Sequence, residues 1–222
     1  MKYLAVLKRL FLLLWLGSTV LNAQITDEAV NRSLNALQAG NATADDPEIS
    51  RLITTYRFQV PELYRRYEQT TEEYKRIEAQ FAEAGIPPYF ALIPYCESKF
   101  NPSRKGYGTA GLWQFSAQSA RNFGLTVKKG HDERLDPGRS TEAAIRYIKS
   151  LKRQFGSWYL VDFAYAMGEG TLYRMIRKNG SEEIQVLLRD PHFPSGTKAH
   201  FAKTLLLDAR IHHSDPVPSE SE

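Results

Sequence analysis

Apolar residues recur at helical spacing between Pro61 and Gly85. Charged residues fill the gaps, as on an amphipathic helix. The apolar positions, at spacings of three, four and seven, are Leu63, Tyr64, Tyr67, Tyr74, Ile77 and Phe81. We expect this helix to end at Gly85. Pro87-Pro88 then restarts the chain, because proline suits the first turn of a helix.

The next helix is predicted from about Pro88 to Ser98. Its apolar run from Phe90 to Tyr95 leaves little polar face, which indicates a central, buried helix. Asn101-Pro102 ends it. A flexible turn follows at three glycines, Gly106, Gly108 and Gly111.

Further helical segments are predicted along the rest of the chain. They cover residues 113–123, 140–155, 158–167, 172–178, 181–188 and 198–211. Ser140-Thr141 is the expected cap of the helix that ends near Phe155. The sequence contains no long alternating strand and no repeat, so the patterns predict a mainly α fold.

The two ends of the chain differ from this helical middle. Residues 1–23 combine a basic start, an apolar run too short for a comfortable membrane span and small residues near Ala23. This layout is typical of a secretory signal peptide, with an uncleaved anchor as the alternative. Residues 24–60 are polar, so we expect a linker or loosely attached lead-in. The remaining divisions are a domain over residues 61–211 and a flexible tail over residues 212–222.

Composition and charge exclude some classes of function. The 222 residues are 42% hydrophobic and 24% charged, as in soluble globular proteins. Without Lys2, Lys8 and Arg9 the chain carries 26 basic and 25 acidic side chains. This balance argues against nucleic-acid binding. The sequence contains no Gly-Lys-Ser/Thr loop, which argues against a phosphate-binding enzyme.

Metal, cofactor and disulfide chemistry are not indicated. Cys96 is the single cysteine, and its apolar surroundings predict a buried thiol. No Cys/His cluster has zinc spacing, and His212 and His213 are adjacent in a polar segment. We therefore expect no metal site and no cofactor.

Glu97 is a lone carboxylate at the end of an apolar helix, just before the glycine-rich turn. The negative end of the helix dipole and the apolar neighbours both disfavour its charge, so the sequence predicts a raised pKa, above about 5.5. A carboxyl group that keeps its proton near neutral pH is suited to general acid catalysis. For an isolated glutamate, the alternative is a capping or salt-bridge role.

A set of ordered motifs around Glu97 resembles the soluble lytic transglycosylase domain, which is related to goose-type lysozyme. The motifs are Glu97-Ser98, Phe100-Asn101-Pro102, Gly111-Leu112-Trp113-Gln114, Asp132 to Asp136, Ala164 to Gly170 and Phe193 to Leu206. The last segment is similar to the closing segment of the membrane-bound transglycosylase D branch. The resemblance covers residues 61–211.

The resemblance implies a lysozyme-like α-helical fold that cleaves the β-1,4 bond between N-acetylmuramic acid and N-acetylglucosamine. Glu97 would protonate the glycosidic oxygen and then take the proton of the C6 hydroxyl, which closes a 1,6-anhydro ring. The family uses one catalytic carboxylate, with help from the N-acetyl group of the substrate. This fits the absence of an obvious second acid near Glu97, which a two-carboxylate scheme would require.

The resemblance also implies substrate-binding residues. Ser98 and Gln114 would lie beside the acid and the sugar, and Tyr165 would hydrogen-bond near Glu97. Gly111 would let the backbone come close to the saccharide. Trp113 is expected in the core or pocket wall, with sugar stacking as the alternative.

Departures from the family pattern bear on activity. Ala166 stands where the family has Asn, and Lys105 falls about where Ser is common. Tyr107 could fill some of the vacated space, and we expect it to be a substrate-binding residue as well. The alternative functions are therefore a catalytically weak or inactive peptidoglycan-binding module and a hydrolysing goose-type lysozyme.

The expected partner is the glycan strand of peptidoglycan, met in the periplasm by a monomer that could associate with the cell wall or membrane. No accessory wall-binding repeat is recognisable in the sequence. This indicates recruitment by envelope machinery or an intrinsic affinity for glycan.

Overall fold

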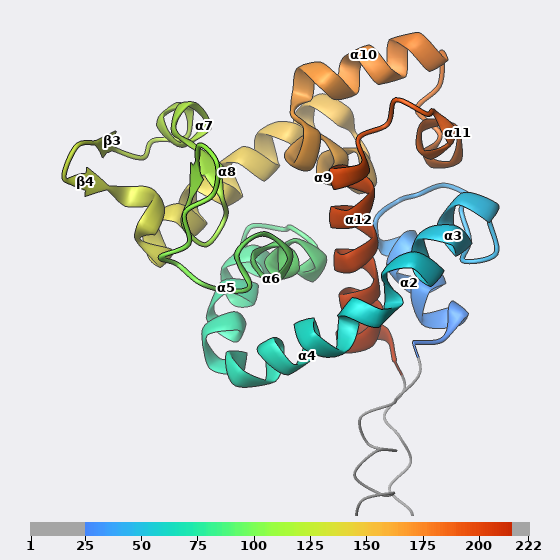
Figure 1. Cartoon of the computed structure of the whole chain (residues 1–222), viewed down its shortest axis with the longest axis horizontal. Coiled ribbons are helices and arrows are strands. Elements are labelled where there is room, and N and C mark those ends of the chain that lie inside the picture. The colour runs from blue at the N-terminus through green and yellow to red at the C-terminus, as the bar shows by residue number, and fades with distance from the viewer. Residues whose placement is uncertain (1–24, 215–222) are drawn as a thin grey trace, which may run out of the picture.

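The computed structural model describes residues 25–214, and within that range it is mainly helical (Figure 1). The first elements are α2 (Asp27–Ala36), α3 (Pro47–Tyr56), η1 (Arg57–Gln59), α4 (Val60–Gln69), α5 (Thr71–Glu83), η2 (Pro88–Leu92) and α6 (Ile93–Ser98). The middle contains β1 (Thr109–Ala110), β2 (Phe115–Ser116), α7 (Ala117–Asn122), β3 (Val127–Lys128), β4 (His131–Asp132) and η3 (Glu133–Leu135). The last are α8 (Pro137–Phe155), α9 (Trp158–Met167), α10 (Glu169–Asn179), α11 (Ile184–Arg189), α12 (Ser195–Asp208) and η4 (Ala209–His213).

This architecture confirms the predicted mainly α class. The predicted signal peptide lies outside the described residues. Within residues 25–214 we find no helix with the length and apolarity needed to cross a membrane.

Helix α12 is the centre of the fold. It contacts α2, α3, α4, α6 and α9, and Figure 1 shows it between the α4–α6 side and the α2–α3 side. A helix that is buried on nearly every face belongs to the core. Its buried residues are Thr197, His200, Phe201, Ala202, Thr204, Leu205, Leu206, Leu207 and Asp208. The polar members of this set therefore need partners inside the protein.

The expectation of a loosely attached lead-in over residues 24–60 is wrong for the described part. Helices α2 and α3 pack on α12, and α2 also packs on η4. Val30, Leu34 and Ile49 are 0% exposed. Thr26 caps α2, because its hydroxyl accepts a hydrogen bond from the Ala29 N–H. The polar composition of this segment belongs to the outer faces of two amphipathic helices.

The single helix predicted from Pro61 to Gly85 is divided in two at Thr70. The Thr70 hydroxyl donates back to the Arg66 carbonyl at 2.8 Å and lies 2.6 Å from the Tyr95 hydroxyl. The Thr71 hydroxyl donates to the Tyr67 carbonyl at 3.0 Å. Such side-chain bonds to the preceding turn compete with the helical ladder. The break turns α5 relative to α4, although the apolar periodicity runs through it.

The helix predicted from Pro88 to Ser98 is a 3-10 segment, η2, that continues into α6. Its burial is confirmed, because Phe90, Leu92 and Ile93 are 0% exposed. Pro94 lies in the first turn of α6, where a missing backbone N–H costs little. The buried run thereby brings the C-terminal end of α6 against α12.

Two antiparallel hairpins follow α6 in the chain, and Figure 1 shows the second, β3–β4, at one edge of the molecule. In the first, Thr109 pairs with Ser116 and Ala110 with Phe115. In the second, Val127 pairs with Asp132. The segment predicted as helical from Trp113 to Phe123 is therefore part strand, and its helix is the shorter α7.

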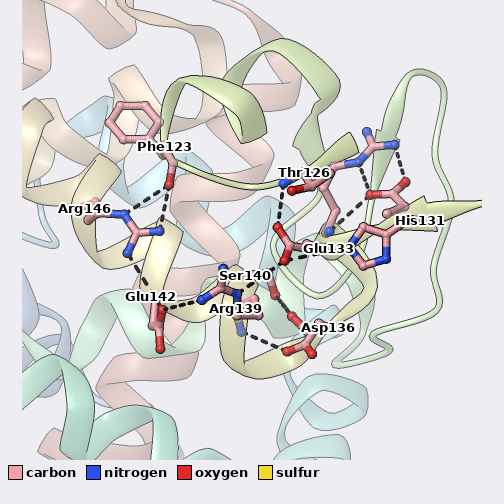
Figure 2. A network of polar contacts seen from close by, with 11 residues as sticks. Phe123, Thr126, His131, Glu133, Asp136, Arg139, Ser140, Glu142 and Arg146 are labelled. Carbon is pink, nitrogen blue, oxygen red and sulfur yellow. Dashed lines mark hydrogen bonds and ion pairs between the residues drawn. The ribbon is translucent and has the colours of Figure 1, made fainter. Parts of the chain in front are cut away.

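A polar network fixes the start of α8 (Figure 2). Asp136 caps the helix, since its carboxylate accepts from the Arg139 N–H at 2.9 Å. The helix begins at Pro137, so the cap predicted at Ser140-Thr141 is wrong. The Ser140 hydroxyl lies inside the first turn and donates to the Asp136 carbonyl at 2.6 Å. The labelled members are Phe123, Thr126, His131, Glu133, Asp136, Arg139, Ser140, Glu142 and Arg146. The network holds the second hairpin and α7 against α8.

The tail predicted as flexible from His212 is folded at its first residues. The His212 ring places Nδ1 2.7 Å from the Asp208 carboxylate and Nε2 3.1 Å from the Tyr74 hydroxyl. Nε2 also lies 3.2 Å from the Glu78 carboxylate. These contacts attach η4 to α5. Residues 215–222 lie outside the described range.

Gly111→Ala should destabilise the fold strongly. Gly111 has φ 82°, and a Cβ there would lie 1.7 Å from the Arg134 carbonyl oxygen. Backbone strain and overpacking together should lower the free energy of unfolding by about 3 kcal/mol. Gly130→Ala is the control, because its φ of 79° is similar but no atom lies within 4 Å of its Cβ position. The control should cost about 1 kcal/mol. Equal losses in urea unfolding would contradict the close packing of Gly111 on η3.

His212→Gln should destabilise the protein more in acid than in base. Burial lowers the pKa of His212, but the hydrogen bond and charge of Asp208, with Glu78, outweigh it and raise that pKa. The stabilisation is thus fully present below the unfolded pKa of about 6.5 and is lost as pH rises through the folded pKa. Urea unfolding at about pH 5.5 and about pH 9 should show the larger loss at the lower pH. A loss that does not depend on pH would contradict the charged pair.

Candidate active site

Glu97 lies in the last turn of α6 and opens onto a pocket of about 270 Å³. Its side chain is 29% exposed. The pocket is lined by Glu97, Thr109, Trp113, Gln114, Phe115, Ser116, Ser119, Tyr147, Tyr165, Ala166 and Gly168. Glu97 is the one carboxylate in this lining. Acid–base chemistry by a carboxyl group in the pocket therefore depends on it.

The turn after α6 fixes where Glu97 points. Lys99 and Phe100 both have positive φ, 54° and 58°, a conformation that side chains disfavour. The Phe100 N–H donates to the Pro94 carbonyl at 3.0 Å, which closes the turn. The buried Ser98 hydroxyl also donates to Pro94, at 2.9 Å. Ser98 therefore stabilises the helix end, and it is not among the residues that line the pocket.

Gln114 closes the glycine-rich loop that forms one wall of the pocket. Its Oε1 accepts from the Thr109 hydroxyl at 2.9 Å. Its Nε2 donates to the Gly111 carbonyl at 2.7 Å and to the Arg104 carbonyl at 3.2 Å. The amide is thus fully used within the loop. Gln114 shares the pocket lining with Glu97, and its contacts give it the task of shaping the wall.

Two residues predicted to bind substrate do not line the pocket. Gly111 packs against the Arg134 carbonyl of η3, so its lack of a side chain serves the packing of the loop. Tyr107 is wholly exposed. Tyr107 therefore does not fill the space beside Ala166. Ala166 lines the pocket, and Tyr107 is not part of that lining.

Tyr165 and Trp113 connect the loop to the core. The Tyr165 hydroxyl donates to the Trp113 carbonyl at 2.8 Å, rather than holding Glu97 as predicted. Trp113 is 1% exposed, its Nε1 donates to the Thr141 hydroxyl at 3.0 Å, and its ring stacks on Phe81. The core position expected for Trp113 is confirmed. Burial, and then the charge of Glu97, raises the pKa of Tyr165 well above its ordinary value.

His200 contacts Glu97 from behind the pocket, and sequence reasoning did not identify it. Its Nδ1 lies 2.7 Å from Glu97 Oε1, and its Nε2 lies 3.0 Å from Asp162 Oδ1. The side chains of His200 and Asp162 are 5% and 0% exposed. The ring also stacks on Tyr165, with 6.3 Å between centroids. Glu97, on α6, is thus joined through α12 to an acid on α9.

This contact reverses the charge state predicted for Glu97. Burial raises the pKa of Glu97, but the hydrogen bond and positive charge of His200 outweigh it, with help from Lys203 and Arg104. The pKa of Glu97 is therefore below its ordinary value, and the predicted raised pKa is wrong. Burial lowers the pKa of His200, but Asp162 and Glu97 together raise it well above its ordinary value. The unliganded site holds an ion pair.

The sequence did contain a signal for both missed residues. Asp162 is the one charged residue in the apolar run from Trp158 to Met167, and His200 lies on a helix that is buried on nearly every face. Buried polar groups need partners, so Asp162 and His200 were each expected to contact another polar side chain. The pairing itself could not be predicted, because 38 residues separate them.

Ala166, the departure noted in the sequence, lies in the pocket lining and is partly exposed.

Cys96 is only partly buried, and the Thr204 hydroxyl approaches its sulfur at 3.3 Å. Among residues 25–214, no group of three or more His, Cys, Asp or Glu side chains is arranged to hold a metal ion.

Comparison with known proteins relates this geometry to named relatives. The membrane-bound lytic murein transglycosylase D of Escherichia coli (strain K12) is 31% identical over 140 residues, which are 62% of this chain and 31% of that relative. The putative tributyltin chloride resistance protein of Alteromonas sp. (strain M-1) is 34% identical over 102 residues, 45% of this chain and 49% of the relative. The peptidoglycan transglycosylase gp16 of Escherichia phage T7 is 32% identical over 105 residues, 45% of this chain and 8% of the relative.

The first of these alignments thus spans about a third of that relative's length. It supports the predicted likeness to the transglycosylase D branch. The Transglycosylase SLT domain matches residues 75–188, a range that includes Glu97, the glycine-rich loop and Asp162 and stops before His200. Because the match covers just over half of the 222 residues, the chain belongs to the Transglycosylase SLT domain family.

Proposed function

We propose that the protein is a peptidoglycan lytic transglycosylase. It cleaves the β-1,4 bond between N-acetylmuramic acid and N-acetylglucosamine and leaves a 1,6-anhydro end on the muramic residue. Family membership supports the reaction class. The observation that carries the proposal is Glu97, the single carboxylate of a pocket bounded by the glycine-rich loop and α9.

One carboxyl group suffices for this reaction because it acts twice. Glu97 donates its proton to the glycosidic oxygen, and the bond from that oxygen to C1 of the muramic residue breaks. The N-acetyl group of the substrate assists at C1, as the family resemblance implies. Glu97, now a carboxylate, takes the proton of the C6 hydroxyl while O6 bonds to C1. The proton returns to Glu97, and no water is consumed.

The burial of Asp162 disfavours a two-carboxylate mechanism. Such a mechanism needs a second acid that reaches the sugar, about 5 to 10 Å from the first. Asp162 is 0% exposed and lies behind the His200 ring. It therefore cannot activate a water in the pocket or attack C1. This supports the transglycosylase over the hydrolysing lysozyme that the sequence left open.

The pocket walls suit a saccharide. The hydroxyls of Thr109, Ser116 and Ser119 lie in the lining together with the rings of Tyr147 and Tyr165. Polar groups that fix orientation and rings that offer flat apolar faces are common in ligand sites. We assign the positioning of the sugar to these side chains and to the loop backbone that Gln114 holds.

The cellular setting is also proposed. A chain of this kind acts on the glycan strands of peptidoglycan, in the periplasm, and the signal peptide expected over residues 1–23 would take it there. The name of the transglycosylase D relative supports an envelope location. Recruitment by envelope machinery and a monomeric state complete the proposal.

Mass spectrometry of the muropeptides that the mature protein releases from purified murein tests the proposal. A transglycosylase yields an anhydro product that is one water lighter than the product of hydrolysis. Products with a reducing end would establish a hydrolysing lysozyme. Binding to murein with no released product would establish a binding module.

Glu97→Gln should abolish turnover and leave the fold and glycan binding in place. The amide keeps an oxygen for His200 but cannot carry the transferred proton. General acid–base groups contribute roughly 10²–10⁴-fold, and here one group serves both steps. Release of anhydro muropeptides should be measured beside a thermal melt. A folded variant that keeps more than about a tenth of the wild-type rate would mean that another group is the proton donor.

Ala166→Asn should be tolerated and should keep or raise activity. Ala166 is partly exposed in the pocket lining, so the amide has room and restores the polar group that the family pattern carries. Ala164→Asn is the matched control, because Ala164 is 0% exposed on the same helix. The control should lower the melting temperature sharply, since it buries an amide in the core. A collapse of stability in Ala166→Asn as well would show that residue 166 does not face the pocket.

A further inference from the structure

Glu97 has a supporting pair of residues that the proposed function does not use. We propose that His200 and Asp162 are positioning residues that act on the reaction through Glu97: they hold its carboxylate in one orientation and set the pH range in which it can donate a proton. The inference rests on the proposed function, and it adds residues that never touch the substrate.

With Glu97 and Asp162 both ionised, the geometry requires His200 to be an imidazolium. Nδ1 faces a Glu97 oxygen at 2.7 Å, and Nε2 faces an Asp162 oxygen at 3.0 Å. A carboxylate oxygen only accepts hydrogen bonds, so each ring nitrogen must donate. A neutral ring has one N–H and would leave one of these two contacts without a proton. With both carboxylates ionised, His200 therefore carries two protons and a positive charge.

Asp162 is placed to maintain that charge. It is 0% exposed, and among the described residues its second oxygen has no hydrogen-bond partner. The neighbouring Tyr89 hydroxyl is also buried without one. The negative charge of Asp162 is thus directed at the His200 ring. A buried charge is strongly destabilising without its partner, so Asp162 and His200 depend on one another.

Two further cations near Glu97 act in the same direction as His200. Lys203, on α12, and Arg104, in the loop, both favour the carboxylate. Burial raises the pKa of the Cys96 thiol, and burial together with nearby charge raises that of the Tyr165 hydroxyl. Both side chains therefore stay neutral. His200 hydrogen-bonds to Glu97 directly.

This arrangement divides the two oxygens of Glu97 between two tasks. Oε1 is held by His200, so the carboxyl group cannot rotate freely. The exposed part of the side chain faces the pocket, where the transferred proton is carried. His200 keeps both of its protons throughout, because the proton lost to the glycosidic oxygen is replaced by the proton of the C6 hydroxyl.

The His200 cation lowers the pKa of Glu97, so Glu97 keeps its proton only at lower pH. The enzyme should therefore work best in acid. Its kcat/KM should fall about tenfold for each pH unit above the pKa of Glu97, because kcat/KM follows the protonation state of the free enzyme. Removing the cation would leave only Lys203 and Arg104 to oppose burial and would move this alkaline limb upward.

Asp162→Asn and His200→Gln should each move the alkaline limb of kcat/KM to higher pH, by about one to two pH units. Each variant replaces a charged side chain by a neutral amide. The glutamine at position 200 can still donate an N–H to Glu97 without a charge. The pH profile is measured on solubilised glycan strands by release of anhydro muropeptides. Activity that falls equally at all pH values, with the limb unmoved in both variants, would overturn the proposal.

Asp208→Asn is the matched control. Asp208 is 2% exposed and holds His212 at 2.7 Å, so it is a second buried Asp–His pair on the C-terminal end of α12. The variant should lose stability and keep the wild-type pH limb. A shift as large as that of Asp162→Asn would assign the effect to general loosening of α12, and the proposal would fall.

A titration of the Glu97 carboxyl carbon by ¹³C NMR separates this inference from the proposed function. The resonance is assigned by its loss in Glu97→Gln, and the measurement needs no turnover. The carbon should titrate at higher pH in Asp162→Asn and His200→Gln than in the wild type. If it titrates at the same pH in all three, the inference fails even in an active enzyme. If the shift is present but no anhydro product forms, the proposed function fails alone.

Discussion

The site depends on one interaction, the charged hydrogen bond from His200 to Glu97 with Asp162 behind it. It joins three helices: α6 supplies the acid that faces the pocket, α12 supplies the ring, and α9 supplies the buried counter-charge. His200 and Asp162 would each be costly in the core alone, and the ring joins Asp162 to Glu97 through one hydrogen bond on each side. Helix α12 can carry the ring between them because it contacts both α6 and α9.

The glycine-rich loop forms another wall of the pocket and is held by side-chain hydrogen bonds and close packing. Gln114 uses every polar atom of its amide to close the glycine-rich loop, and Gly111 lets that loop lie against η3. Tyr165 and Trp113 then attach the loop to the core. A catalytic constellation needs such rigid support, because small displacements of the reacting groups are costly. The residues of the family motif mostly serve this support, and the proposed function assigns the chemistry to Glu97.

Local patterns in the sequence predicted the helical class and the buried run before Glu97, and they singled out the carboxylate that lines the pocket. They failed where distant residues decide the outcome. The pKa of Glu97 was predicted from its own helix and came out in the wrong direction, because its partner His200 is 103 residues away. Residues 25–60 read as a polar lead-in because the buried faces of α2 and α3 are narrow. Ser98 fitted the family motif, but its hydroxyl bonds to the backbone of its own helix.

The protonation state of His200 tests the central claim most directly. The chain has 5 histidines, and ¹⁵N NMR of the imidazole nitrogens can follow each, with His200→Gln providing the assignment. The account predicts that both ring nitrogens of His200 carry protons through neutral pH and lose one only well above the ordinary histidine pKa of about 6.5. A His200 ring that is neutral at pH 7, in the folded wild-type protein, would contradict the ion pair and the role given to Asp162.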